Sequence, residues 1–142
     1  MIKILLCCGG GFSSSYVAVR MQKEIEEKGL ENQYSIEFYP LGVAGLKYAK
    51  EKLNQYDIAI CCPHLKMDVK KMMVEREAFH MPIYLLPPKI YGNMHLEDII
   101  MDCEDIIQMF KEGHINPVSF PGEDNLLRIR RGVAYRKTQK NK

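Results

Sequence analysis

The residues best suited to chemistry in this sequence are a cysteine and the glycines and serines that come directly after it. Cys8 is followed by Gly9, Gly10, Gly11, Phe12, Ser13, Ser14 and Ser15. Consecutive glycines let backbone N–H groups turn toward a bound anion, because no Cβ atom stands in the way. The serines add hydroxyl donors, and one of them can cap a helix. The pattern indicates a nucleophilic thiol beside a loop that can hold a phosphoryl group.

Two regular elements must position this loop. The apolar run Ile2–Cys7 predicts a short buried strand, and Tyr16–Lys28 predicts an amphipathic helix. The partial positive charge of a helix N-terminus favours the thiolate of Cys8 and favours a phosphoryl group attached to it. In the alternative interpretation, Cys8 is a small apolar residue that ends a core strand, and the glycines only make a tight turn.

The remaining pattern alternates strands with helices. Further strands are expected at Tyr34–Tyr39, Asp57–Cys62 and Pro82–Leu86, and helices within Leu41–Asn54, Leu65–Arg76 and His95–Lys111. This order predicts an α/β fold with a four-stranded, mostly parallel open sheet in the order 2-1-3-4 and helices on both faces. Ligands bind at the carboxyl edge of such sheets. That edge would collect the Cys8 loop, the segment 62–64 and an expected loop from Pro87 to Asn93.

Smaller features complete the expected fold. Met67, Met72 and Met73 are expected to point into the core, and Gly113 is expected to end the last helix. We therefore divide the chain into a domain at residues 1–113 and an irregular extension at residues 114–142, with a short strand or turn near Leu126–Val133.

The extension ends in a basic run. Residues 128–142 contain four arginines, three lysines and no acidic residue, whereas the whole chain carries a net charge of +2. A run of this kind can bind a polyanion or a membrane surface, but a solvated flexible tail is the commoner explanation, and we expect no nucleic-acid partner. No apolar stretch approaches the roughly 18 residues that span a bilayer. A cytoplasmic location is expected.

The five cysteines are expected to be free thiols, since neighbouring cysteines rarely bridge each other. A redox or metal module that uses Cys7, Cys8, Cys61, Cys62 and His64 is one alternative, because all of these could lie near the same strand ends. Structural zinc sites favour Cys-x-x-Cys spacing, which these residues lack. We therefore expect no cofactor and no metal.

The strand, the loop and the helix together resemble the phosphocysteine loop of lactose/cellobiose-type IIB components of the bacterial phosphotransferase system (PTS). Their pattern is roughly Cys-x-x-Gly-x-Ser-[Ser/Thr]-Ser, and residues 8–15 match it. Pro63 after the third strand and Tyr91-Gly92 after the fourth agree, so that the resemblance covers about residues 1–112. It implies that Cys8 is the nucleophile and that residues 9–15 hold the phosphoryl oxygens. Pro63, His64, Tyr91 and Gly92 are candidates for the surrounding positions.

The resemblance also implies a reaction and its partners. A phosphohistidine of a IIA component would phosphorylate Cys8, and the phosphocysteine would pass the group to a sugar, expected to be a β-linked disaccharide, held by a membrane IIC component. Membrane association would be transient and would occur only through IIC.

Phosphatases of similar topology place an arginine in the loop, and Walker loops place Gly-Lys-[Ser/Thr] there; this loop has neither. The alternative is a regulatory or thiol-redox protein that retains the fold.

Overall fold

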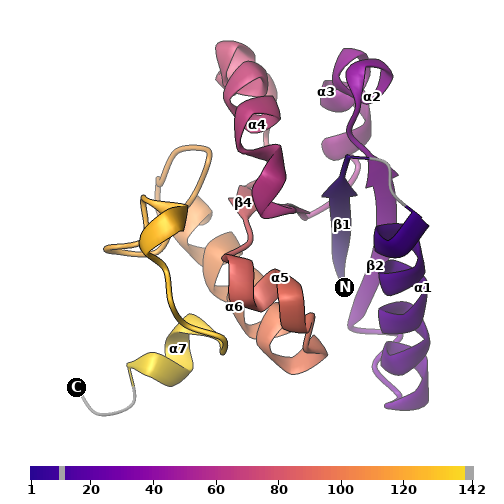
Figure 1. Cartoon of the computed structure of the whole chain (residues 1–142). Helices are drawn as coiled ribbons and strands as arrows, with labels where there is room; N and C mark the ends of the chain where they lie inside the picture. The colour runs from indigo at the N-terminus through magenta and orange to yellow at the C-terminus, as the bar shows by residue number, and fades with distance from the viewer. Residues whose placement is uncertain (10–11, 140–142) are drawn as a thin grey trace.

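The computed structural model describes residues 1–9 and 12–139, and the side chains of residues 12–14 and 43–44 lie outside this description. Strands and helices alternate along the chain, as the sequence predicts (Figure 1). The elements are β1 (Ile2–Cys8), α1 (Phe12–Glu27), β2 (Tyr34–Pro40), α2 (Val43–Lys47), α3 (Ala49–Leu53), β3 (Ile58–Cys61), η1 (Pro63–Leu65), α4 (Lys66–Met72), η2 (Met73–Ala78), β4 (Ile83–Leu85), α5 (Pro88–Asn93), α6 (Leu96–Lys111), η3 (Leu126–Arg128) and α7 (Tyr135–Thr138).

The four strands form a parallel sheet in the order β2-β1-β3-β4, which confirms the predicted order. The two central strands are buried because they carry continuous apolar runs; Leu5, Leu6 and Ile60 are fully buried. Strand β2 lies at an edge, where Ile36 is buried, Glu37 and Pro40 are exposed and the remaining residues are partly exposed. The register places Cys7 opposite Cys61, so β1 and β3 end side by side.

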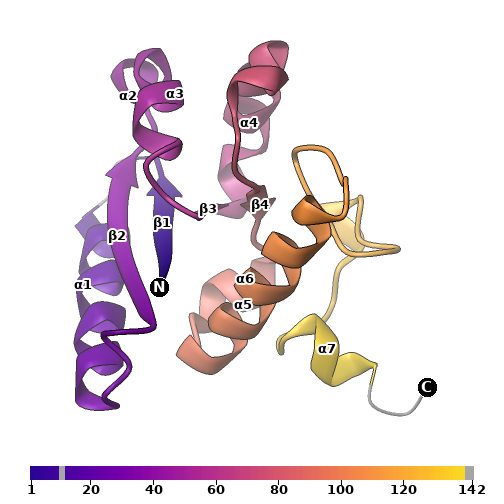
Figure 2. The same ribbon diagram turned by 180° about the vertical axis from the view of Figure 1, so that it is seen from behind.

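Helices cover both faces of the sheet. Helix α1 packs against β2 and α6 packs against β3, and the two views from opposite sides place these helices on opposite faces (Figures 1 and 2). Gly113 has a φ of +107° just after α6, which confirms it as the helix stop. Among residues 1–9 and 12–139, no helix is both long enough and apolar enough to cross a membrane.

Three local predictions are corrected. The segment Lys89–Met94 is mostly helix α5 rather than a loop, because Pro88 begins a helix well, its fixed φ suiting the first turn. Residues 41–54 contain the two short helices α2 and α3 in place of one. Met72 is buried as expected, but Met67 is 61% exposed.

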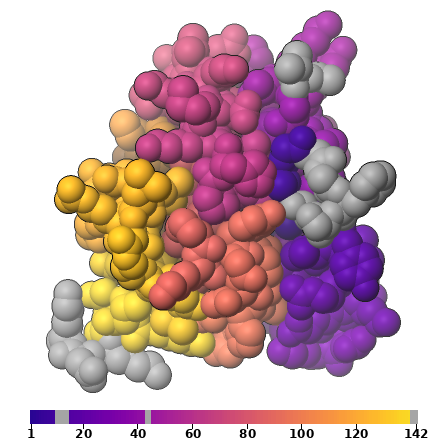
Figure 3. Space-filling model, in the orientation of Figure 1, coloured from indigo at the N-terminus to yellow at the C-terminus, as the bar shows by residue number. Residues whose placement is uncertain are grey.

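The basic C-terminal run differs most from its prediction. The run is predicted to extend into solvent as a flexible tail. The Arg131 side chain within it is instead only 6% exposed, and it makes ion pairs of 2.8 Å with Asp102 and 2.7 Å with Glu123. Residues 126–128 form a 3-10 helix and no strand. Figure 3 shows the orange and yellow C-terminal residues lying directly against the α5 and α6 part of the molecule.

Candidate active site

Cys8 is the last residue of β1 and lies where three segments of the chain meet. Its Sγ atom is 3.3 Å from Nε2 of His64 and 3.9 Å from the Tyr91 hydroxyl. His64 lies in η1, just after β3, and Tyr91 lies in α5, just after β4. The parallel sheet places all three residues at its carboxyl edge, where the strand and loop pattern predicts the site. The distance to Nε2 allows a sulfur–imidazole hydrogen bond.

Local sequence explains how His64 and Tyr91 are held. Pro63 occupies the first position of η1, and its fixed φ directs the chain from β3 into this turn. The rings of His64 and Tyr91 meet edge to face, with centroids 6.1 Å apart. Such aromatic pairs stabilise each other by about 0.5–1.5 kcal/mol. The pair therefore forms a defined wall beside the Cys8 sulfur.

The predicted phosphate-binding residues are described only in part. Gly9 is exposed, and a Cβ atom built on it would lie 3.6 Å from Nε2 of His64, so the glycine and the imidazole are neighbours. Ser15 is half-buried in the first turn of α1. The residues Gly10 and Gly11 and the side chains of Phe12, Ser13 and Ser14 lie outside the described residues.

Of the surrounding positions predicted, His64 and Tyr91 meet at Cys8. Pro63 comes directly before His64 and begins η1. Gly92 is exposed in α5. The site therefore draws on the loop after β1, on η1 and on α5.

Cys62 is a neighbour of the site that the predicted set of site residues omits. Its sulfur, the Cys8 sulfur and a ring nitrogen of His64 all lie within 4.8 Å of one another. Burial, and after it the hydrogen bond with Cys8, raises the pKa of the Cys62 thiol to about 12. The sequence signal was available in the adjacent Cys7-Cys8 and Cys61-Cys62 pairs, because aligning the two central strands brings Cys62 next to Cys8.

The other cysteines have different environments. Cys7 and Cys61 face each other across β1 and β3, and both are fully buried. The hydrogen bond with Cys7, together with burial, raises the pKa of Cys61. Burial likewise raises the pKa of Cys103, which lies in α6. Among the five thiols, Cys8 has the largest exposed fraction, although it is only 4%.

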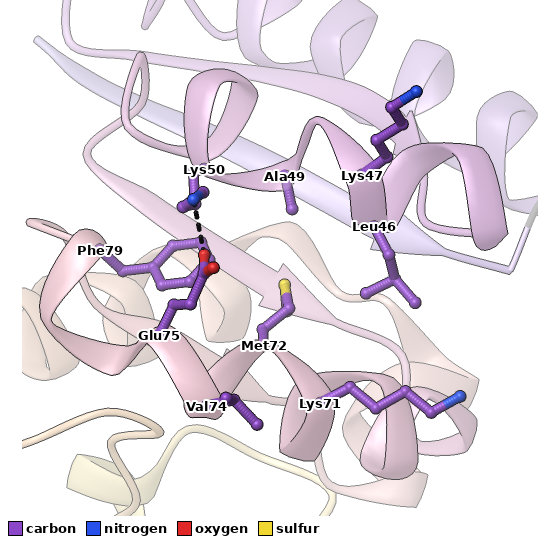
Figure 4. A pocket seen from close by; sticks show the side chains of 9 residues that line it. All are labelled: Leu46, Lys47, Ala49, Lys50, Lys71, Met72, Val74, Glu75 and Phe79. Atoms are coloured by element: carbon purple, nitrogen blue, oxygen red, sulfur yellow. Dashed lines mark ion pairs between the residues drawn. The ribbon is translucent and has the colours of Figure 1, made fainter.

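A groove of about 430 Å³ lies between α2–α3 and α4–η2 (Figure 4). Its lining is partly apolar, with Met72 and Phe79 among its residues, and an ion pair of 2.6 Å joins Lys50 to Glu75 across it. Cys8, His64 and Tyr91 do not line this groove. None of the described residues that line it carries a thiol or an imidazole, so the groove is separate from the cluster at the ends of β1 and β3.

The fold and the site define an α/β protein with a cysteine at the carboxyl end of its first strand and an imidazole beside the sulfur. The family model for the lactose/cellobiose-specific IIB subunit of the PTS matches residues 3–102. The chain belongs to this family, which confirms the resemblance seen in residues 8–15. It is therefore a sugar-transport component of a PTS, a phosphotransferase that works with IIA and IIC components.

No curated protein matches the sequence. Among solved structures, the chain is similar to the lactose-specific IIB component domain of the phosphoenolpyruvate:carbohydrate phosphotransferase system from Streptococcus pneumoniae, with 17% sequence identity and a TM-score of 0.47. The similarity covers 80% of this chain and 97% of that chain.

Proposed function

We propose that this chain is a phosphoryl relay that accepts the group on Cys8 and passes it to a sugar. The proposal is carried by the Cys8 sulfur, which lies 3.3 Å from Nε2 of His64 at the carboxyl edge of the sheet in a member of the IIB family. The donor is a phosphohistidine of a IIA component. The acceptor is a sugar, a β-linked disaccharide, held by a membrane IIC component.

The relay has two displacement steps. The Cys8 thiolate attacks phosphorus, a P–S bond forms, and the P–N bond to the donor imidazole breaks. A sugar hydroxyl then attacks phosphorus, a P–O bond forms, the P–S bond breaks and the hydroxyl proton leaves to a base or to solvent. His64 is positioned to take the thiol proton of Cys8 before the first step, because its Nε2 atom is at hydrogen-bond distance.

The loop after β1 and the start of α1 hold the transferred group. Residues 9–15 supply backbone N–H groups and serine hydroxyls to the phosphoryl oxygens, and the N-terminus of α1 adds its partial positive charge. These contacts position the group and stabilise its charge without any covalent step. Pro63, Tyr91 and Gly92 shape the surrounding wall.

The proposed relay also assigns the parts of the chain and its location. Residues 1–113 form the relay domain, and residues 114–142 form the C-terminal extension. The protein acts in the bacterial cytoplasm and reaches the inner face of the membrane only transiently, through IIC. It binds neither a nucleic acid nor a cofactor in this function.

Intact-mass analysis tests the relay and its nucleophile. Wild type, Cys7→Ser, Cys8→Ser and the control Cys103→Ser are each mixed with phosphoenolpyruvate, the general phosphotransferase proteins and a cognate IIA. We expect one added phosphoryl group on every protein except Cys8→Ser. Loss of the group in Cys7→Ser alone would move the nucleophile to Cys7, and no added mass on wild type with several IIA candidates would refute the relay.

A further inference from the structure

We propose that Cys8, Cys62 and His64 form a binding site for a zinc ion, which the relay itself does not use. The two sulfurs and the imidazole nitrogen all lie within 4.8 Å of one another, and one of these separations, from Cys8 Sγ to His64 Nε2, is 3.3 Å. Zinc binds cysteine sulfur at about 2.3 Å and histidine nitrogen at about 2.0–2.1 Å, which in a tetrahedron separates the donors by about 3.5–3.8 Å. The Cys8–His64 separation is already close to this range.

The backbone holds two of these ligands in place before any metal binds. Cys8 ends β1, and Cys62 comes directly after β3, which pairs with β1 in parallel register. The N–H of Cys62 donates to the carbonyl of Cys7 at 3.1 Å, and the N–H of Leu86 donates to the carbonyl of Cys61 at 2.8 Å. These bonds fix the ends of the two strands. The two thiols therefore stay adjacent without a Cys-x-x-Cys spacing.

The third ligand determines how a metal enters. His64 is exposed, whereas Cys8 and Cys62 are 4% and 0% exposed, so an ion reaches the sulfurs from the imidazole side. Three protein ligands leave the fourth tetrahedral position to water or to another small ligand, unlike a closed structural site. Binding forms two Zn–S bonds and one Zn–N bond, and the protons of the two thiols pass to solvent.

The ligand set makes the metal a reversible inhibitor of the relay, a consequence that rests on the proposed function. A zinc ion on the Cys8 sulfur occupies the electron pair that would attack phosphorus, and His64 can no longer accept a proton at its ligating nitrogen. Phosphoryl transfer to Cys8 and zinc binding therefore exclude each other. A substitution of Cys62 distinguishes zinc binding from phosphoryl transfer, because the metal uses this thiol as a ligand and the proposed relay does not use it.

Direct metal binding tests the ligand set independently of any phosphoryl transfer. Protein freed of metal by a chelator is titrated with Zn²⁺ by calorimetry and with Co²⁺ by absorption, where thiolate ligands give a charge-transfer band. We expect one ion per wild-type chain, and an affinity at least about tenfold weaker in both Cys62→Ser and His64→Ala. Cys103→Ser, which changes a buried thiol in α6, is the matched control and should bind like wild type.

The fold of each variant is checked by circular dichroism, and His64→Ala provides a test at an exposed position if Cys62→Ser fails to fold. Wild type that binds no zinc, or binding that survives in both Cys62→Ser and His64→Ala, overturns the proposed site. A Co²⁺ complex without the thiolate band overturns it as well.

Phosphorylation by IIA is then measured with chelator and with free Zn²⁺ held at a concentration that saturates wild type but not Cys62→Ser in the calorimetric titration. Zinc should abolish phosphorylation of wild type, whereas Cys62→Ser should keep most of the phosphorylation that the same variant shows with chelator, which also shows that the other proteins tolerate zinc. Equal zinc inhibition of wild type and Cys62→Ser would overturn the regulatory inference. Wild type that stays unphosphorylated even with chelator would instead refute the relay, and the Co²⁺ spectrum would still decide the ligand set.

Discussion

Replacing Arg131 with methionine should destabilise the protein strongly, although the residue lies beyond the part of the chain that the family model matches. The guanidinium makes ion pairs with Asp102 and Glu123 and donates at 2.7 Å to the Tyr84 hydroxyl. Its carbon atom lies 5.2 Å from the centre of the Phe120 ring. Methionine keeps most of the apolar stem and removes the charge, so the substitution isolates the ionic contribution.

The magnitude follows from burial. The side chain of Asp102 is 1% exposed and that of Arg131 is 6% exposed, so removal of the arginine leaves a carboxylate buried without its cation. Breaking a buried ion pair in this way costs about 3–5 kcal/mol of the free energy of unfolding. The same carboxylate still accepts hydrogen bonds from the Tyr84 hydroxyl and the Tyr135 N–H, which places the expected loss toward the lower end, near 3 kcal/mol.

Urea denaturation followed by circular dichroism measures the effect, and Arg136→Met is the matched control. Arg136 also pairs with an acidic residue of α6, Asp105 at 2.9 Å, but its side chain is 45% exposed. An exposed pair of this kind contributes less than about 1 kcal/mol. In the double variant Arg131→Met/Asp102→Asn, no charge remains at position 102, so the loss should be smaller than the sum of the single losses by about 0.5–3 kcal/mol. If Arg131→Met loses no more stability than Arg136→Met, the reasoning from burial is refuted.

Three further predictions follow from other contacts. Although burial opposes it, a backbone N–H and the Lys137 ammonium hold the pKa of Asp98 below its ordinary value of 3.8. The stabilisation from these bonds is complete above pH 3.8 and is lost as the pH falls through the lowered pKa of Asp98. Between neutral pH and about pH 3, the free energy of unfolding should therefore decrease more in wild type than in Asp98→Asn. Asn116 is 2% exposed and bonds two backbone groups through its side chain, so Asn116→Ala should cost about 2–3 kcal/mol in urea denaturation. Peptide mapping after brief alkylation of the native protein near neutral pH should find Cys8 modified before the fully buried Cys62, whose pKa is raised to about 12; equal labelling would contradict the described burial.

The sheet could be predicted from the sequence because each central strand carries a continuous apolar run bounded by a turn-forming residue. Ile58–Cys61 is an example, since Pro63 follows it closely and every residue in it is buried. Local pattern and tertiary burial agree in such a strand. The predicted order 2-1-3-4 is confirmed, although right-handed parallel connections are compatible with it without fixing it. The position of Cys8 at the carboxyl edge follows from the same pattern.

The predictions that are wrong concern segments whose local sequence fits more than one secondary structure, or side chains whose burial depends on a partner far away in the sequence. A loop is predicted from Pro87 to Asn93, but Pro88 suits a first helical turn as well as a turn between strands. Arg131 belongs to a run of basic residues that, judged from the sequence alone, would be exposed to solvent. It becomes buried only because Asp102 on α6 and Glu123 supply opposite charges from elsewhere in the chain. The spacing of apolar and charged residues along the sequence does not indicate such an ion pair.

In the candidate site too, one part could be predicted from the sequence and another part depends on the tertiary structure. Cys8 is predicted as the nucleophile from the glycines and serines that follow it, whereas the cluster with Cys62 and His64 depends on the pairing of β1 with β3. Spacing rules for metal sites describe ligands that share one turn. They do not detect ligands that two parallel strands bring to the same edge, which is why the spacing argued against the metal site that we propose.

The C-terminal extension and the candidate site are connected through β4 and α5. The Tyr84 hydroxyl in β4 bonds Asp102 and Arg131, and the chain then enters the helix that carries Tyr91. The same helix is contacted directly by the extension, because the Asn93 side chain donates to the carbonyl of Gly132 at 3.3 Å. Contacts made after residue 113 therefore help to hold the helix that places a hydroxyl 3.9 Å from the Cys8 sulfur. Since Arg131 and Gly132 lie beyond residue 102, where the family match ends, the physical unit that shapes the site is longer than the segment that the family model matches.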